Sequence, residues 1–264
     1  MRFPVLSLPF IPKPKILVIG YGFVGKTVAQ NLIHNDYRVE ILDPAKGKPA
    51  RPYDCAGAII CVNTPTRADG SCDDSNVVDA IRTAEQLVKS KRIMVKSTVT
   101  PDLVTKYPKQ VVMNPEFLKQ TNAYEDFKNQ KFMVWGGDLE QIRWWNNIFK
   151  HIVCPRVTTT REAASWIKYI HNTWLATKVV FFHELHKAAV THDQLDDLHK
   201  AIEGVKQYDE QVGPSHMYAP NLSGALGYEG ACFPKDTQAF SQFADAELLK
   251  EVIRINDGLN KERL

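Results

Sequence analysis

The sequence predicts an α/β protein in which a doubly wound, mostly parallel sheet is followed by a helical domain with one long central helix. Short apolar runs rich in β-branched residues alternate with helical stretches as far as residue 155, and such alternation is typical of a parallel sheet with helices on both faces. Beyond Pro155 no strand candidate of comparable strength follows, and residues 158–190 have the pattern of one helix. We therefore expect three parts: an N-terminal extension at 1–14, a sheet domain at 15–155 and a helical domain at 156–264.

The individual elements follow from hydrophobic periodicity. Strands are expected at the short apolar runs Lys15–Ile19, Arg38–Leu42, 57–62, 92–95, 110–113 and 131–135. Helices are expected between them at 26–35, 75–90 and 139–148. Thr159 and Glu162 have the spacing of a capping box at the start of the long helix.

Charge and composition exclude several classes of protein. The 33 Lys and Arg residues against 30 Asp and Glu leave a net charge of +3, which is too small for a nucleic-acid or membrane-surface footprint. No apolar run approaches the ~18 residues of a membrane span, and the prolines of the N-terminal stretch argue against a signal peptide. We expect a cytoplasmic protein that binds neither nucleic acid nor membrane. The five cysteines lack metal-ligand spacing and are odd in number, so neither a metal site nor disulfides are expected.

A glycine-rich turn follows the first predicted strand and opens the first predicted helix. It consists of Gly20, Tyr21, Gly22, Phe23, Val24 and Gly25. In this context the first glycine permits a tight turn, the second lets a pyrophosphate approach the backbone, and the third lets the helix pack on the strand. The helix N-terminus then faces the phosphates. The turn predicts a Rossmann domain that binds a dinucleotide.

The acidic residue that completes this motif is Asp43, which lies 18 residues after Gly25 at the end of the second predicted strand. A carboxylate there accepts hydrogen bonds from the ribose 2′-hydroxyl and repels a 2′-phosphate, so NAD is favoured over NADP. Lys46 weakens this preference only slightly. Two alternatives remain at this point: Asp43 could cap a turn before Pro44, and FAD could replace NAD.

Several further motifs occur in order along the chain. They are Cys61-Val62-Asn63-Thr64-Pro65, Lys96-Ser97-Thr98-Val99, Asn114-Pro115-Glu116-Phe117-Leu118, Lys168 with Asn172, and Gly230-Ala231-Cys232-Phe233-Pro234-Lys235-Asp236. Together they resemble the UDP-glucose dehydrogenase family, whose members oxidise the C6 alcohol of a sugar nucleotide to a carboxylate with two NAD. The resemblance implies a sugar-nucleotide 6-dehydrogenase and a UDP-glucose type of substrate.

Cys232 is the residue for which the sequence itself supports a chemical role. Pro234 suits a first helical position, so Cys232 is expected at a helix N-terminus. The helix field and Lys235 would favour the nucleophilic thiolate. Without its neighbours a single Cys is more often a buried packing residue.

Lys168 and Asn172 are four residues apart, so they share one face of the long helix. That face could simply be solvated. The resemblance instead places both side chains in the active site, where Lys168 stabilises an oxyanion and Asn172 positions a water or the substrate oxygen. Thr98 and Thr64 are expected at the carboxyl edge of the sheet, where they would bind cofactor or water, although Thr64 could equally satisfy a backbone group.

The resemblance also implies a mechanism. A water held by Asp236 or Lys168 accepts the proton of the C6 hydroxyl in the first oxidation. Cys232 then attacks the resulting aldehyde, the adduct is oxidised to a thioester, and water assisted by Glu116 hydrolyses it. Asp236 could alternatively serve only to favour its helix N-terminus. The implied binding residues are Val62, Thr64, Thr98 and Lys235 for cofactor, and Glu116, Phe117, Leu118, Lys168, Asn172, Gly227 and Gly230 for substrate.

The sequence departs from the family at several positions. The resemblance implies a third domain that binds the nucleotide after the helical domain, and the expected helical domain extends to Leu264, the last residue given. Gln211, Glu229 and Ser165 stand where an arginine, a glycine and an acid are usual. Two alternatives therefore accompany the dehydrogenase: a non-catalytic or partner-dependent NAD-binding subunit, and a dehydrogenase of a smaller alcohol or aldehyde.

An apolar stripe on the long helix favours a homodimer through that helix, although packing against the protein's own core would explain it equally well. The stripe comprises Trp166, Tyr169, Ile170, Trp174, Val180 and Phe181.

Overall fold

The computed structural model describes residues 13–49, 54–221 and 224–261, so most of the expected N-terminal extension lies outside the described residues. The chain forms two compact units. The first comprises residues 1–63, 75–97 and 107–161, and the second comprises residues 64–74, 98–106 and 162–264. Two segments between strands therefore belong to the second unit.

The first unit is built on a seven-stranded sheet with the order β2-β1-β3-β4-β5-β6-β7. Neighbouring strands pair in parallel except β5 and β6, which are antiparallel. The bounds are β1 Lys15–Ile19, β2 Arg38–Leu42, β3 Gly57–Ile60, β4 Ile93–Val95, β5 Val111–Met113, β6 Met133–Gly136 and β7 Arg156–Thr159. The predicted α/β class with a doubly wound, mostly parallel sheet is confirmed.

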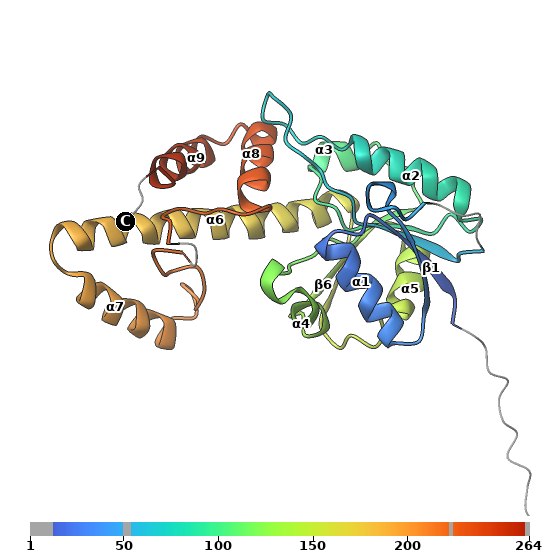
Figure 1. Ribbon diagram of the computed structural model, residues 1–264, viewed down its shortest axis with the longest axis horizontal. Helices are drawn as coiled ribbons and strands as arrows, with labels where there is room; N and C mark the ends of the chain where they lie inside the picture. Colours follow the sequence, from blue (N-terminus) through green and yellow to red (C-terminus); the bar gives the residue numbers. More distant parts are fainter. Residues whose placement is uncertain (1–12, 50–53, 222–223, 262–264) are drawn as a thin grey trace, which may run out of the picture. The chain divides into compact units, whose positions relative to one another are not determined.

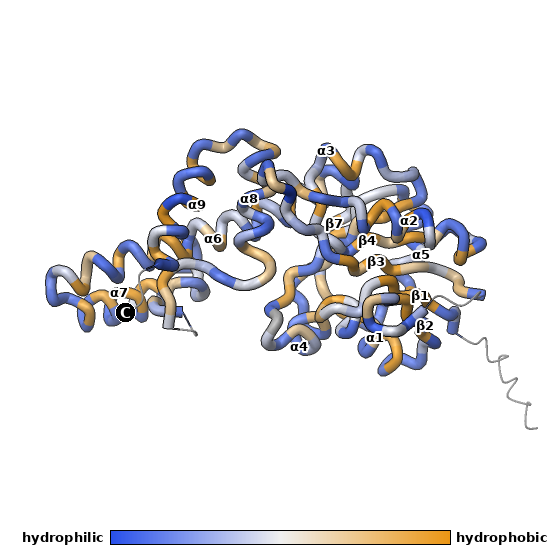
Figure 2. Tube along the Cα trace, turned by 45° about the horizontal axis from the view of Figure 1, so that its top comes forward, coloured by the Kyte–Doolittle hydropathy of each residue, from blue (hydrophilic) through white to orange (hydrophobic). Residues whose placement is uncertain are grey.

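Helices cover both faces of this sheet (Figure 1). Side chains of α1 (Phe23–His34), α4 (Ala123–Lys128) and α5 (Leu139–Ile148) join one apolar cluster with sheet residues such as Ile59 and Val112. On the opposite face, α2 (Ser75–Leu87) contacts β3 and β4. Short 3-10 turns occupy Pro44–Lys46 and Gln120–Asn122. The central strands β3 and β4 are buried along their whole length, as their apolar colour in Figure 2 reflects, because parallel strands are covered on both sides.

The second unit is helical. It contains α3 (Pro101–Val104), nearly all of α6 (Arg161–Thr191), α7 (Leu195–Tyr208), α8 (Phe233–Ala244) and α9 (Glu247–Leu259). In Figure 1, α6 is the long helix along which α8 and α9 lie on one side and α7 folds back on the other. Apolar clusters such as Tyr169 with Phe240 and Val180 with Val252 hold these helices together. The expected long central helix is thus confirmed.

Two details differ from the sequence prediction. Residues Arg156–Thr159 form β7, so the long helix begins at Arg161 and not near Thr158. This strand was missed because it is partly exposed and has no continuous apolar run, whereas its β-branched Val157, Thr158 and Thr159 favour an extended chain. Across the described part of the chain, no helix has the length and apolar character of a membrane span.

Candidate active site

The glycine turn connects β1 to α1 as predicted. The space around the Cα atom differs between its three glycines. Gly20 has φ +89°, and a Cβ there would lie 2.7 Å from the carbonyl oxygen of Cys61. A Cβ on Gly25 would lie 1.9 Å from the carbonyl oxygen of Gly20. A Cβ on Gly22, which caps α1, would meet nothing within 4 Å. Two glycines are thus required by backbone packing, while Gly22 leaves open space beside the first turn of α1.

This arrangement fits a dinucleotide. The open side of Gly22 and the first N–H groups of α1 form a place where a pyrophosphate can approach the backbone. Asp43 follows β2, and its Oδ2 accepts a hydrogen bond from the backbone N–H of Tyr21 at 2.8 Å. The carboxylate is thereby fixed beside the turn with its remaining acceptor sites available to a ribose hydroxyl. Phe23 and Val24 form the first residues of α1.

The carboxyl ends of β3, β4 and β5 bring further polar groups to the same sheet edge. The carbonyl of Val62 accepts a hydrogen bond from the Ser97 hydroxyl at 2.7 Å. Glu116 is 7% exposed, and its Oε2 accepts the backbone N–H of Leu118 at 2.7 Å. Burial raises the pKa of Cys61 to about 12, against a lowering effect of the Lys96 ammonium. Cys61 is therefore a packing residue at neutral pH.

Lys96 and Asn114 form a buried pair at this edge to which we assigned no role from the sequence. The Lys96 ammonium donates to Asn114 Oδ1 at 2.7 Å and lies over the Phe127 ring, 5.3 Å from its centroid. Both residues lie in motifs that follow adjacent parallel strands. Their position directly after β4 and β5 was the available signal, because the ends of neighbouring parallel strands meet at one edge.

Cys232 occupies the N-cap of α8 in the second unit, with Pro234 in the first turn. The side chain is half-buried, and its carbonyl accepts the backbone N–H of Asp236 at 2.8 Å. Burial alone would lower the pKa of Lys235, but the Asp236 carboxylate raises it above its ordinary value, with smaller contributions from Cys232 and Cys72. A protonated Lys235 therefore interacts favourably with a Cys232 thiolate, as expected of a reactive cysteine.

Asp236 connects the N-terminus of α8 to α6. Its carboxylate pairs with the Lys235 ammonium through Oδ1 and accepts the side-chain amide of Asn172 through Oδ2 at 2.6 Å. Asp236 is 1% exposed. The two carboxylate oxygens thus hold one cation and one amide in place, and a buried carboxylate with both partners satisfied is rigid.

The two threonines singled out from the sequence lie together in the second unit. The Thr64 hydroxyl donates to the Thr98 carbonyl at 2.8 Å, and the Lys235 ammonium lies 3.4 Å from the same hydroxyl. Thr64 thus satisfies a backbone group, which is one of the two roles left open by the sequence, and its role in binding cofactor stays a prediction. The Thr98 side chain is half-buried.

The remaining predicted residues divide between the two units. Lys168 lies one helical turn before Asn172 on α6 and is 3% exposed, so their face of the helix is buried rather than solvated. Gly227 is buried and Gly230 is exposed, and both have positive φ in the segment before α8. Phe117 and Leu118 belong to the first unit, where Phe117 packs on Phe132 with ring centroids 4.7 Å apart.

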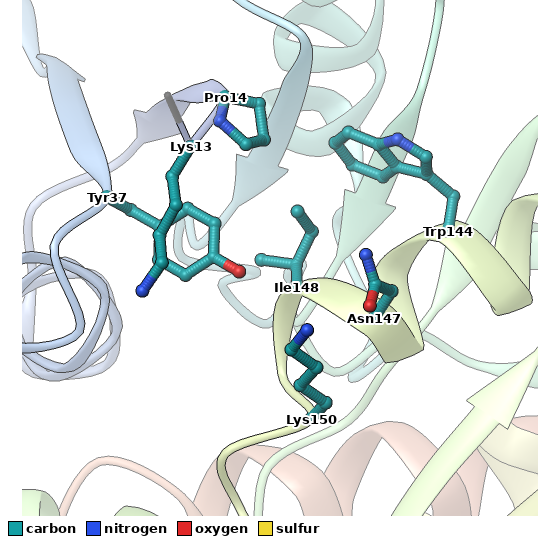
Figure 3. Close-up of a pocket in the computed structure, with 7 residues that line it drawn as sticks. All are labelled: Lys13, Pro14, Tyr37, Trp144, Asn147, Ile148 and Lys150. Atoms are coloured by element: carbon teal, nitrogen blue, oxygen red, sulfur yellow. The ribbon is translucent and has the colours of Figure 1, made fainter. Parts of the chain in front are cut away.

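The first unit also has a cavity that none of the predicted site residues lines (Figure 3). Lys13, Pro14 and Tyr37, just before β1 and β2, line it together with the α5 residues Trp144, Asn147 and Ile148 and with Lys150. It therefore lies at the amino ends of the strands, opposite the glycine turn.

Fold, glycine turn and acidic partner define the class of this protein as an NAD-binding Rossmann protein. Residues 45–153 match the NAD binding domain of the UDP-glucose/GDP-mannose dehydrogenase family, and residues 162–258 match its central domain. The chain belongs to this family.

Individual relatives agree with this assignment. YtcA of Bacillus subtilis, a relative named as a UDP-glucose 6-dehydrogenase, is 33% identical over 92% of this chain and 67% of its own length. The UDP-glucose 6-dehydrogenase YwqF of the same organism is 30% identical over 75% of this chain and 48% of its own length. The chain therefore spans about half to two thirds of these relatives.

Solved structures show the same fold. A UDP-glucose dehydrogenase from Pyrobaculum islandicum is 25% identical, with a TM-score of 0.77 over 98% of this chain and 70% of its own. A 3-hydroxyisobutyrate dehydrogenase from Mycobacterium tuberculosis is 15% identical, with a TM-score of 0.67 over 95% of both chains. The second likeness concerns the fold alone.

Proposed function

We propose that the chain is an NAD-dependent sugar-nucleotide 6-dehydrogenase of the UDP-glucose type, which oxidises a C6 alcohol to a carboxylate through a covalent adduct on Cys232. The observation that carries the proposal is the position of Cys232 at the N-terminus of α8, whose first turn also holds Lys235 and the buried Asp236 that accepts a hydrogen bond from Asn172. A packing cysteine requires none of these partners, whereas a nucleophilic thiolate is stabilised by the helix N-terminus and the cation.

The reaction proceeds in two oxidations. Bound NAD supplies the hydride acceptor in each of them. In the first, the C6 carbon loses hydride and its hydroxyl gives a proton to water held by Asp236 or Lys168, which yields an aldehyde. The Cys232 thiolate then adds to the carbonyl carbon, and the new oxyanion takes up a proton to give a thiohemiacetal. Lys168, a buried cation one turn from Asn172, stabilises this oxyanion.

In the second oxidation the thiohemiacetal carbon loses hydride and its hydroxyl loses a proton, which gives a thioester. Water attacks this thioester with the help of Glu116, and cleavage of the C–S bond releases the carboxylate and regenerates Cys232. Covalent capture keeps the aldehyde from escaping between the two steps. The role of Glu116 rests on the family resemblance, and Glu116→Gln is expected to slow hydrolysis and allow the thioester to accumulate.

The experiment that tests this function measures NADH formation with UDP-glucose, GDP-mannose and their N-acetyl relatives. The expected result is two NADH per molecule of product for the wild type and no complete oxidation with Cys232→Ser. Cys154→Ser is the matched control, because Cys154 is also half-buried but burial raises its pKa. Binding of NAD without NADH formation for any of these substrates would contradict the proposal and would favour a non-catalytic NAD-binding subunit.

We also propose that the protein forms a homodimer through α6. Four members of the expected stripe are exposed in the second unit, at 41% for Trp166, 59% for Ile170, 58% for Trp174 and 56% for Phe181. Tyr169 and Val180, in contrast, pack into the unit's own core. Exposed large apolar side chains along one helix face indicate a protein partner. Trp174→Glu is expected to convert a dimer into a monomer in light scattering, and a wild-type monomer would refute dimerisation.

A further inference from the structure

The segment that leads from α7 to α8 is fastened to the long helix by a buried histidine. His183 of α6 is 2% exposed. Its Nδ1 is 2.6 Å from the backbone nitrogen of Gly227, and its Nε2 is 3.1 Å from the carbonyl oxygen of Tyr218. A backbone N–H can only donate and a carbonyl can only accept, so Nδ1 must be the acceptor and Nε2 must carry the proton. The two contacts together require the neutral ring with its proton on Nε2.

The next residue of this segment is fixed from a second helix. Asn256 of α9 accepts the backbone N–H of Tyr228 at 2.6 Å and donates to its carbonyl at 3.3 Å. Gly227 has φ +83°, and a Cβ there would lie 2.6 Å from Asn256 Oδ1. The backbone at Gly227 and Tyr228 is therefore held between α6 and α9 by hydrogen bonds from His183 and Asn256.

We call the hydrogen bonds of His183 and Asn256 to this backbone the clamp. Aromatic packing connects the clamped Tyr228 to the residue that follows Cys232. The Tyr228 ring meets the Phe233 ring edge to face, with centroids 6.2 Å apart. Phe233 follows Cys232 directly and is the first residue of α8. The position of Tyr228 thus bears on how Cys232 lies against the helix N-terminus and Lys235.

We propose that His183 is a positioning residue for Cys232, which holds Gly227 through its neutral ring and releases it when Nδ1 takes up a proton. The inference deepens the proposed function, on which the role of Cys232 rests. A protonated ring presents N–H groups on both sides, so Nδ1–H would face Gly227 N–H without an acceptor between them. Release of Gly227 loosens Tyr228 and then the start of α8. The protein would in this way lose reactivity at Cys232 upon acidification.

The surroundings of His183 favour the neutral ring at neutral pH. Burial lowers the pKa of His183, the Tyr218 carbonyl raises it, and the neighbouring His186 lowers it slightly. Among the described residues, charged groups near the clamp include Glu203 and Lys206 of α7, which hydrogen-bond to the Tyr218 hydroxyl, and Asp257 of α9, whose carboxylate raises the pKa of Tyr228. Because the folded pKa is lowered, the clamp is complete above about pH 6.5 and is lost as the pH falls toward the folded value.

Three variants separate the two contacts of the ring. His183→Asn places an amide oxygen near the position of Nδ1, so the variant keeps an acceptor for Gly227 but does not reach Tyr218. His183→Gln places its amide near the position of Nε2, so the variant keeps a donor for Tyr218 but leaves Gly227 without its acceptor. His186→Asn is the matched control, because His186 lies one turn further along the same helix and is as buried, at 4% exposed.

The first measurement is the tautomer of His183 in the wild-type protein, from nitrogen chemical shifts of 15N-labelled histidine. The expected result at pH 7.5 is a proton on Nε2 and none on Nδ1. A proton on Nδ1 at this pH would overturn the inference without reference to any variant. This measurement and the next require neither cofactor nor sugar nucleotide, so they remain decisive if no NADH is formed.

The second measurement is hydrogen exchange of the peptide that covers residues 217–232, together with the rate at which iodoacetamide alkylates Cys232. His183→Gln is expected to exchange faster and to alkylate about tenfold more slowly at pH 7.5, as loss of one buried hydrogen bond implies. His183→Asn is expected to stay within about twofold of the wild type and, unlike it, to keep its exchange protection as the pH falls through the folded pKa of His183. Wild-type exchange in His183→Gln, or an equal effect of His186→Asn, would overturn the inference.

Discussion

Gly25→Ala tests whether the glycine turn is built by close packing of backbone on backbone. The new Cβ would lie 1.9 Å from the Gly20 carbonyl oxygen and 3.4 Å from the Cys61 side chain. Because the first of these neighbours is backbone, no rotamer change relieves the overlap, and α1 must move away from the turn by about 1 Å or more. Overpacking costs 1–3 kcal/mol in typical cores, and we expect the upper end, about 3 kcal/mol, at this site.

The assay for Gly25→Ala combines thermal unfolding with NAD titration by calorimetry. A loss of about 3 kcal/mol corresponds to a Tm lower by roughly 6–12 °C for a chain of this size. Displacement of α1 also removes its N-terminal N–H groups from the pyrophosphate, so NAD affinity falls as well.

Gly22→Ala is the matched control for this prediction. Its Cβ would meet nothing within 4 Å, and φ of −71° is open to alanine. The Tm is therefore expected to stay unchanged, while NAD affinity falls about tenfold or more because the methyl group occupies the pyrophosphate's path. The reasoning is refuted if Gly25→Ala melts within about 1 °C of the wild type, or if both variants bind NAD as the wild type does.

Three further predictions concern single side chains. Limiting iodoacetamide at pH 8 is expected to label Cys232 well before Cys61, because burial raises the pKa of Cys61 to about 12. Peptide mapping would show Cys61 labelled first if the assignment were wrong. Asp236→Asn leaves Lys235 without its carboxylate. Because the Lys235 side chain is 26% exposed, we expect a loss of about 2 kcal/mol in urea unfolding, and an unchanged midpoint would refute the network. Burial lowers the pKa of His151, so its contribution to stability is complete above about pH 6.5 and declines below it, and unfolding of His151→Gln should depend less on pH than that of the wild type between pH 7 and 5.

Local patterns predicted the parts of the structure that depend on neighbours in sequence. The spacing from Gly20 to Asp43 fixed the first strand, turn, helix and second strand, because these elements are consecutive and their hydrophobic periods differ. Pro234 likewise predicted that Cys232 begins a helix. Both predictions rest on backbone preferences of a few adjacent residues.

Contacts between distant segments could not be predicted in the same way. The pairing of Thr64 with Lys235 joins residues 171 positions apart, and the hydrogen bond from Gly227 to His183 joins residues 44 apart. Each of these residues taken alone is compatible with an ordinary buried or surface role. Only the packed fold decides which polar groups meet, because side-chain hydrogen bonds carry no periodic signal.

The path of the chain through the two units has a consequence for how such a protein can be divided. The chain passes between the units five times, since residues 64–74 and 98–106 belong to the second unit while the strands around them belong to the first. Cys72 and Leu103, which lie in these two segments, help to form the apolar cluster around Tyr169 and Phe240. A cut near residue 161 would therefore separate α6 from part of its own core, and the sheet fragment would retain Cys72 and Leu103 without their packing partners. Recombination of halves between homologues at this point, or a single proteolytic nick there, is therefore expected to leave the helical unit without a complete core.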